Sequence, residues 1–155
     1  MRAYHQQGGT ERKLVNILKS NKQMGSDYEQ TVCQALAAEG YWVHNFANRQ
    51  NGQPMDIIAV KDNRAILIDA KVCSDGKFRT SRIEENQVLS MKKWFSCGNT
   101  TAMLWISMPD DIQYLLPIMD AGHLDRILQK SVLNADDLRQ MGYAIERSVQ
   151  NIANS

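Results

Sequence analysis

Two acidic residues and a lysine interrupt the apolar stretch "PMDIIAVKDNRAILIDAKV" at residues 54–72. These residues are Asp56, Asp69 and Lys71. Carboxylates are hard oxygen donors, and a divalent cation such as Mg2+ is held in proteins by one or two of them together with water. Two carboxylates in an otherwise apolar stretch therefore indicate a metal site, if the fold brings them together.

A β-hairpin would bring them together. With Asp62 and Asn63 as the two turn residues, the register makes Asp56 face Asp69, and the pleat puts Lys71 on the same side as Asp69. Like charges at paired positions are destabilising unless they share a proton, reach solvent or hold a cation. The alternative is that Asp56 only begins a strand and Asp69 pairs with a basic residue across the sheet.

Helix caps and hydrophobic periodicity predict the surrounding elements in the order αβββαββαα. Ser26 and Glu29 form a capping-box pattern, and Gly40 ends the helix that follows. Ser81 and Glu84 repeat the capping pattern before a second helix. The expected strands are 41–46, 55–60, 65–72, 101–107 and 112–118, and the later helices are 83–97, 121–129 and 135–141. The pattern predicts an α/β fold with a central mixed sheet.

Composition limits the class of protein. The chain has 155 residues, 43% hydrophobic and 23% charged, which fits one globular domain with a substantial core. Its longest apolar runs are shorter than the roughly 18 residues of a membrane span, and its N-terminus has no apolar signal core. Three separated cysteines and three scattered histidines indicate neither a disulfide framework nor a Cys/His metal site. We expect a soluble, cytoplasmic protein with no membrane partner.

The charge is unevenly distributed although the net charge is only +1. Residues 1–24 contain five basic residues and one acidic residue, residues 25–109 are neutral, and residues 110–155 carry a net charge of −3. We therefore expect a basic, partly mobile N-terminal arm at 1–24 and a single domain at 25–155. A basic arm is compatible with a nucleic-acid partner, and a solvated polar arm is the alternative.

The hairpin motif resembles the core of the PD-(D/E)XK nuclease superfamily. "GQPMDIIAV" followed after a turn by "AILIDAKV" is similar to that motif, with Asp56 as its first acidic residue and Asp69-Ala70-Lys71 as its DXK triplet. "GSDYE" resembles the acidic helix motif that supplies a further metal or water ligand, here Glu29.

Downstream segments resemble Holliday-junction resolvases. "SRIEENQVLSM" is similar to the helix after their core, with Gln87 in the place of a polar active-site residue. The later segments "IQYLLPI", "HLDRIL" and "KSVLNADDLRQMGYAI" resemble the C-terminal part of RecU-type resolvases of bacteria and phages. The resemblance covers residues 24–145.

The resemblance implies a restriction-endonuclease-like core and a Mg2+-dependent endodeoxyribonuclease, with Mn2+ expected to substitute. Such an enzyme resolves four-way junctions in DNA recombination and repair by phosphodiester hydrolysis, leaving a 5′-phosphate and a 3′-hydroxyl. It would bind branched or double-stranded DNA as a homodimer, in the host cytoplasm if phage-encoded. The implied catalytic residues are Glu29, Asp56, Asp69, Lys71 and Gln87. The implied metal ligands are Asp56, Asp69, the Ala70 carbonyl and Glu29, although a capping box alone would also account for Glu29.

The loop "DGKFRTSR" places basic side chains directly after the DXK triplet. Lys77, Arg79 and Arg82 suit contacts to DNA phosphates that do not read sequence, and Arg49 is a further candidate. The alternative is a solvated surface loop.

Two departures from the family pattern leave other functions open. Asp69 stands where the resolvases usually have Glu, and "ANRQNGQP" is much shorter than the stalk that RecU resolvases insert into the junction. The alternatives are a nuclease of the same superfamily that acts on flaps, ends or duplex sites, and a noncatalytic DNA-binding protein that keeps the fold.

Overall fold

The computed structural model describes residues 24–46, 54–109 and 112–146. Arg49 and nearly all of the expected N-terminal arm, residues 1–23, lie outside these ranges. No helix in the described ranges is long and apolar enough to cross a membrane.

A mixed six-stranded sheet forms the centre of the molecule, in the order β1-β2-β3-β5-β6-β8. The pair β3–β5 is parallel, and the other neighbouring pairs are antiparallel. The central mixed sheet agrees with the expected α/β class. Its strands are β1 (Trp42–Asn45), β2 (Ile57–Lys61), β3 (Arg64–Val72), β5 (Ala102–Ser107), β6 (Ile112–Ile118) and β8 (Tyr143–Glu146).

The hairpin of β2 and β3 has the predicted register. Val60 pairs with Ala65, and both turn residues have a positive φ, 53° at Asp62 and 62° at Asn63. Two positive φ values define the type I′ turn whose twist matches that of the flanking strands. The pairing runs as predicted from Lys61–Arg64 to Ile57–Ile68. Asp56 lies just before β2, and its N–H donates at 3.2 Å to the carbonyl of Ile68, which is the partner of Ile57. The hairpin prediction is confirmed for the two strands, but the expected direct pairing of Asp56 with Asp69 is not found.

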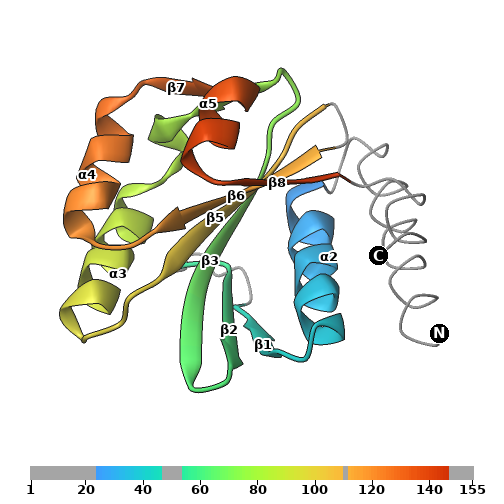
Figure 1. The fold of residues 1–155 in the computed structure, drawn as a ribbon, viewed down its shortest axis with the longest axis vertical. Helices are drawn as coiled ribbons and strands as arrows, with labels where there is room; N and C mark the ends of the chain where they lie inside the picture. The colour runs from blue at the N-terminus through green and yellow to red at the C-terminus, as the bar shows by residue number, and fades with distance from the viewer. Residues whose placement is uncertain (1–23, 47–53, 110–111, 147–155) are drawn as a thin grey trace.

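Helices cover both faces of the sheet (Figure 1). On one face, α2 (Met24–Ala38) packs Tyr28, Val32 and Leu36 against the sheet. On the other face lie α3 (Glu85–Ser96) and α4 (Ala121–Gln129), which enclose the larger apolar core. The helix α5 (Ala135–Met141) packs near β6 and β8.

A small second sheet replaces part of the expected basic loop. β4 (Lys77–Arg79) pairs with β7 (Val132–Asn134), and Phe78 and Leu133 at its centre are both fully buried. A 3-10 helix, η1 (Thr80–Arg82), follows β4. The prediction of a loop here was wrong because these strands are only three residues long and pair with a segment distant in sequence.

The start of α3 differs from the prediction, and Ser26 does not stand at the position of an N-cap. α2 covers Met24–Ala38, so Ser26 lies within the helix. α3 begins at Glu85 with Glu84 at the N-cap, three residues after Ser81. The expected cap at Ser26 therefore no longer accounts for Glu29.

Gly142 marks a close approach between α5 and the sheet. A Cβ built at this position would lie 2.1 Å from the backbone oxygen of Leu115, so backbone would have to move. We expect Gly142→Ala to lower the free energy of unfolding by about 1–3 kcal/mol or more, measured by chemical denaturation. Gly122→Ala is the control, because its Cβ meets only ordinary contacts, the nearest at 3.4 Å. Equal stability of the two variants would contradict the close approach.

Candidate active site

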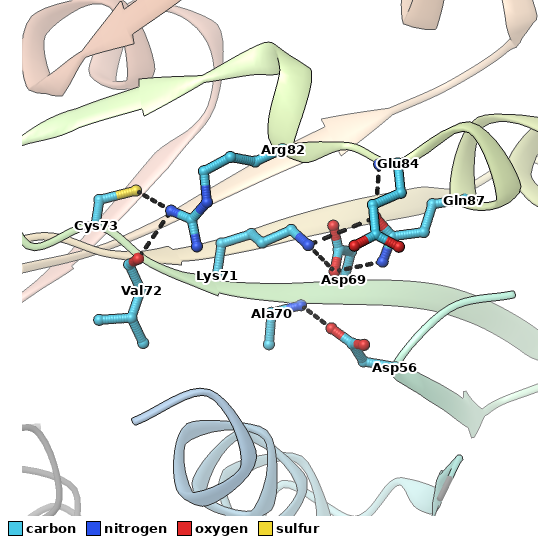
Figure 2. A network of polar contacts seen from close by, with 9 residues as sticks. All are labelled: Asp56, Asp69, Ala70, Lys71, Val72, Cys73, Arg82, Glu84 and Gln87. Carbon is cyan, nitrogen blue, oxygen red and sulfur yellow. Dashed lines mark hydrogen bonds and ion pairs between the residues drawn. The ribbon is translucent and has the colours of Figure 1, made fainter. Parts of the chain in front are cut away.

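Asp69 is the centre of the site. It lies in the middle of β3 with no solvent exposure, and its Oδ1 accepts a hydrogen bond from Gln87 Nε2 at 3.1 Å. Lys71 Nζ lies 3.3 Å from the same oxygen, and the lysine side chain is 14% exposed. Figure 2 shows these three side chains converging above β3 in that view. The structure therefore brings together three of the predicted site residues.

Gln87 links the helix start to this centre. Its Oε1 accepts from the Glu84 backbone N–H at 3.1 Å and lies 3.5 Å from Lys71 Nζ, while its Nε2 donates to Asp69. One buried amide thus caps α3 and orients both charged groups. The sequence placed Gln87 beside the acidic residues, where the structure also has it, and its role at the site stays a prediction. Its capping role was missed, although the Glu84-x-x-Gln87 spacing could have indicated it.

Asp56 lies beside Asp69 at the start of the hairpin. It is 5% exposed, and its Oδ2 accepts from the backbone N–H of Ala70 at 2.8 Å. In Figure 2 it lies below β3, while Asp69 lies above. The two carboxyl groups are close enough that Asp56 raises the pKa of Asp69.

The electrostatics of Asp69 disfavour its charged form. Burial raises the pKa of Asp69 well above its ordinary value, the neighbouring Asp56 raises it further, and Lys71 lowers it. Within the described part of the chain, the buried Oδ2 of Asp69 accepts no hydrogen bond. Such an atom is expensive to bury, and a bound cation would satisfy it.

Glu29 reaches the site from α2. Burial and, to a smaller extent, the negative charge of Asp56 raise the pKa of Glu29 from 4.5 to about 7, against the opposing positive charge of Lys71. Because the charges of Asp56 and Lys71 both affect the pKa of Glu29, the helix α2 and the β2–β3 hairpin contribute charged groups to the same site.

The donor chemistry of this site fits a hard divalent cation. The carboxylates of Asp56, Asp69 and Glu29 supply oxygen atoms of the kind that such a cation prefers. Asp69 Oδ2, which accepts no hydrogen bond from the described residues, could be one of the metal ligands. Among the residues that the structure describes, however, no three His, Cys, Asp or Glu side chains are gathered closely enough to hold a metal by themselves. A cation here would therefore rely on one or two carboxylates and on water, as Mg2+ commonly does.

The predicted DNA contacts differ in their surroundings. Lys77 and Arg79 are exposed on β4, and Arg79 pairs with Asp75 at 2.9 Å. Arg82 is partly buried, with its Nη1 donating to the Val72 carbonyl at 2.8 Å and lying 3.3 Å from Cys73 Sγ. Arg82 therefore contacts the end of β3, whereas Lys77 is exposed on β4.

A comparison with protein families identifies the family of this chain. The family model for archaeal Holliday junction resolvases (Hjc) matches residues 19–151. The chain belongs to that family. Its function is accordingly that of a nuclease that resolves Holliday junctions, as the sequence predicted. None of the curated proteins matches the chain.

A solved structure supports the fold. The chain is similar to Hjc from the archaeal hyperthermophile Archaeoglobus fulgidus, a Holliday junction resolvase, with a TM-score of 0.56 and 14% sequence identity. The match covers 76% of this chain and 93% of that chain. At this identity the likeness shows the fold, and the expected restriction-endonuclease-like α/β class is confirmed. The expected resolvase class is confirmed through the archaeal family and not through RecU.

The pKa of Glu29 predicts how stability varies with pH in the metal-free protein. Because its folded pKa of about 7 exceeds the ordinary value of 4.5, the native state binds more protons than the unfolded state between these pH values. The stabilising contribution of Glu29 is thus fully present below pH 4.5 and is lost as the pH rises to about 7. Thermal denaturation in the presence of a chelator measures the melting temperature at pH 5 and at pH 8. The melting temperature should fall less between these pH values for Glu29→Gln than for wild type. Equal falls would contradict the assignment.

Proposed function

We propose that this protein cuts four-way DNA junctions by Mg2+-dependent phosphodiester hydrolysis at the site around Asp69. The observation that carries the proposal is the buried Asp69 carboxyl with one unsatisfied oxygen, next to Asp56 and Lys71. Membership of a junction resolvase family supports the same reaction and a divalent cation.

The carboxylates would hold the cation. Asp56, Asp69 and the Ala70 carbonyl are the proposed ligands, and Glu29 would hold a metal-bound water or a second ion. When bound, Mg2+ polarises the scissile phosphate and lowers the pKa of water, and Mn2+ is expected to do the same. The raised pKa of Asp69 supports this role, because a cation provides the positive charge that a buried carboxylate lacks.

Lys71 and Gln87 would act on the reacting groups. Lys71 would orient the attacking water, and its neutral amine would help to deprotonate that water, whereas its ammonium form would stabilise the negative charge that develops on the phosphate. Gln87 would position water or phosphate while it orients Asp69 and Lys71 through the contacts described above.

The symmetry of the substrate favours a homodimer, because cutting both strands of a junction requires two active sites. A relation to RecU-type resolvases, and with it a bacterial or phage source, is proposed on the likeness of residues 112–145 alone. Phosphate contacts by Lys77, Arg79, Arg82 and Arg49 are proposed as well.

Asp69→Ala tests the proposed reaction. We expect the variant to bind a synthetic four-way junction but to cut it more than about 100-fold more slowly. Loss of a residue that only orients a metal ligand costs up to about 100-fold, and loss of a ligand itself should cost more. Gel-shift and Mg2+-dependent cleavage assays on junction, flap, nicked and linear DNA measure both properties and the substrate preference. The control is Asp125→Ala, which removes an exposed carboxylate paired with Lys92. Full cleavage by Asp69→Ala would exclude Asp69 from the mechanism, and equal cleavage of all four DNAs would exclude junction specificity.

Lys77→Ala tests the proposed phosphate contact. Each phosphate contact contributes about 0.9 to the slope of log affinity against log salt concentration, so the variant should lower this slope by about that amount. The cleavage rate at saturating protein should stay unchanged, because Lys77 is not part of the Asp69 network. Fluorescence anisotropy with a junction at several salt concentrations measures the slope, and Lys92→Ala, on α3, is the control. An unchanged slope would remove Lys77 from the DNA surface.

A further inference from the structure

The position of Glu29 depends on how α2 lies on the sheet. Glu29 comes from the helix on one face, whereas Gln87 comes from α3 on the opposite face. The carboxylate of Glu29 is coupled to Asp56 and Lys71 through charge. A rotation of α2 about its axis, or a slide along the sheet, would therefore move Glu29 out of the site without breaking a direct bond to it.

Apolar packing alone fixes that position loosely. Val32 and Leu36 follow Tyr28 at four-residue spacing and bury the same helix face. The attraction between apolar surfaces has no preferred direction, so it opposes separation of the helix from the sheet more strongly than it opposes rotation. A directional contact is needed to set the helix rotation.

The residue before Glu29 makes such a contact. Tyr28 has no solvent exposure, and its hydroxyl donates to Gln113 Oε1 on β6 at 2.8 Å. Trp105 Nε1 on β5 donates to the same oxygen at 2.6 Å. Both lone pairs of the Gln113 carbonyl are thereby used, and the acceptor is held on the sheet by a residue of the adjacent strand.

We propose that Tyr28 is a positioning residue for Glu29: its hydroxyl, which donates to Gln113 beside Trp105, sets the rotation of α2 and so keeps the Glu29 carboxylate near the site. Consecutive residues of a helix are about 100° apart around its axis, so fixing Tyr28 fixes the direction of Glu29. This inference rests on the proposed role of Glu29 as a metal or water ligand.

The test compares metal binding by variants of the full-length chain without DNA. Binding of Mn2+ is followed by loss of the electron paramagnetic resonance signal of the free ion. Tyr28→Phe removes only the hydroxyl and keeps the buried ring, and Gln113→Met removes the acceptor from the sheet side. We expect each to weaken Mn2+ binding about 10-fold, the lower end of the range for groups that orient a metal ligand. Junction cleavage should require correspondingly more Mg2+ and recover at saturating Mg2+.

Thr31→Val is the matched control. Thr31 is also buried on α2, but its hydroxyl donates within the helix to the Asp27 carbonyl at 2.9 Å. The variant loses a buried hydroxyl of the same helix without losing a bond to the sheet, so its Mn2+ affinity should equal that of wild type. A loss in Thr31→Val equal to that in Tyr28→Phe would overturn the inference, because any weakening of α2 would then suffice.

A double variant separates this inference from the role of Glu29. If Tyr28 acts through Glu29, adding Tyr28→Phe to Glu29→Gln should cause no further loss of Mn2+ affinity. If the two substitutions instead reduce Mn2+ affinity independently, so that their fold-changes multiply, the positioning role is overturned. Wild-type Mn2+ affinity in both Tyr28→Phe and Gln113→Met would overturn it as well. Wild-type affinity in Glu29→Gln would instead overturn the proposed role of Glu29 itself, and the inference with it.

Discussion

The site is organised by a carboxyl group that the fold buries without satisfying it. Asp69 has no solvent exposure, one of its oxygens is shared by Gln87 and Lys71, and the other accepts no hydrogen bond from the described residues. With two partners on one oxygen and none on the other, the charged form of Asp69 is poorly stabilised in the absence of a cation. The surrounding elements stabilise this arrangement by holding β3 from both sides, with β2 on one edge and β5 on the other.

The carboxyl groups around Asp69 differ in how they are held. Asp56 is fixed by a backbone donor of β3, which keeps it at the hairpin whatever its charge. Glu29 has a carboxyl pKa of about 7 and depends on the placement of a whole helix. The site therefore combines two carboxyl groups of the hairpin region, Asp56 and Asp69, with a third, Glu29, whose position depends on the packing of α2. In metal enzymes such outer contacts commonly orient the ligands and tune their affinity.

The parts of the fold that depend on residues close together in sequence, such as turns and hairpin register, could be predicted from the sequence. The β2–β3 register followed from the turn residues Asp62 and Asn63, and with it the proximity of Asp56 and Asp69. The strands β4, β7 and β8 were missed, since each has only three or four residues and its partner is fixed by tertiary packing. The Tyr28–Gln113 bond joins residues 85 positions apart, and the only signal for it is that a buried tyrosine hydroxyl needs a partner.

Strand order also determines which helix lies beside Asp69. A parallel neighbour for β3 obliges the chain to travel back along the sheet before β5 begins, and the return path here includes α3. The segment between β3 and β5, which makes the parallel pair possible, therefore also places Gln87 of α3 next to Asp69. The segment between β3 and β5 thus serves both the strand order and the site, so replacing it with a short loop would remove the Gln87 contact to Asp69.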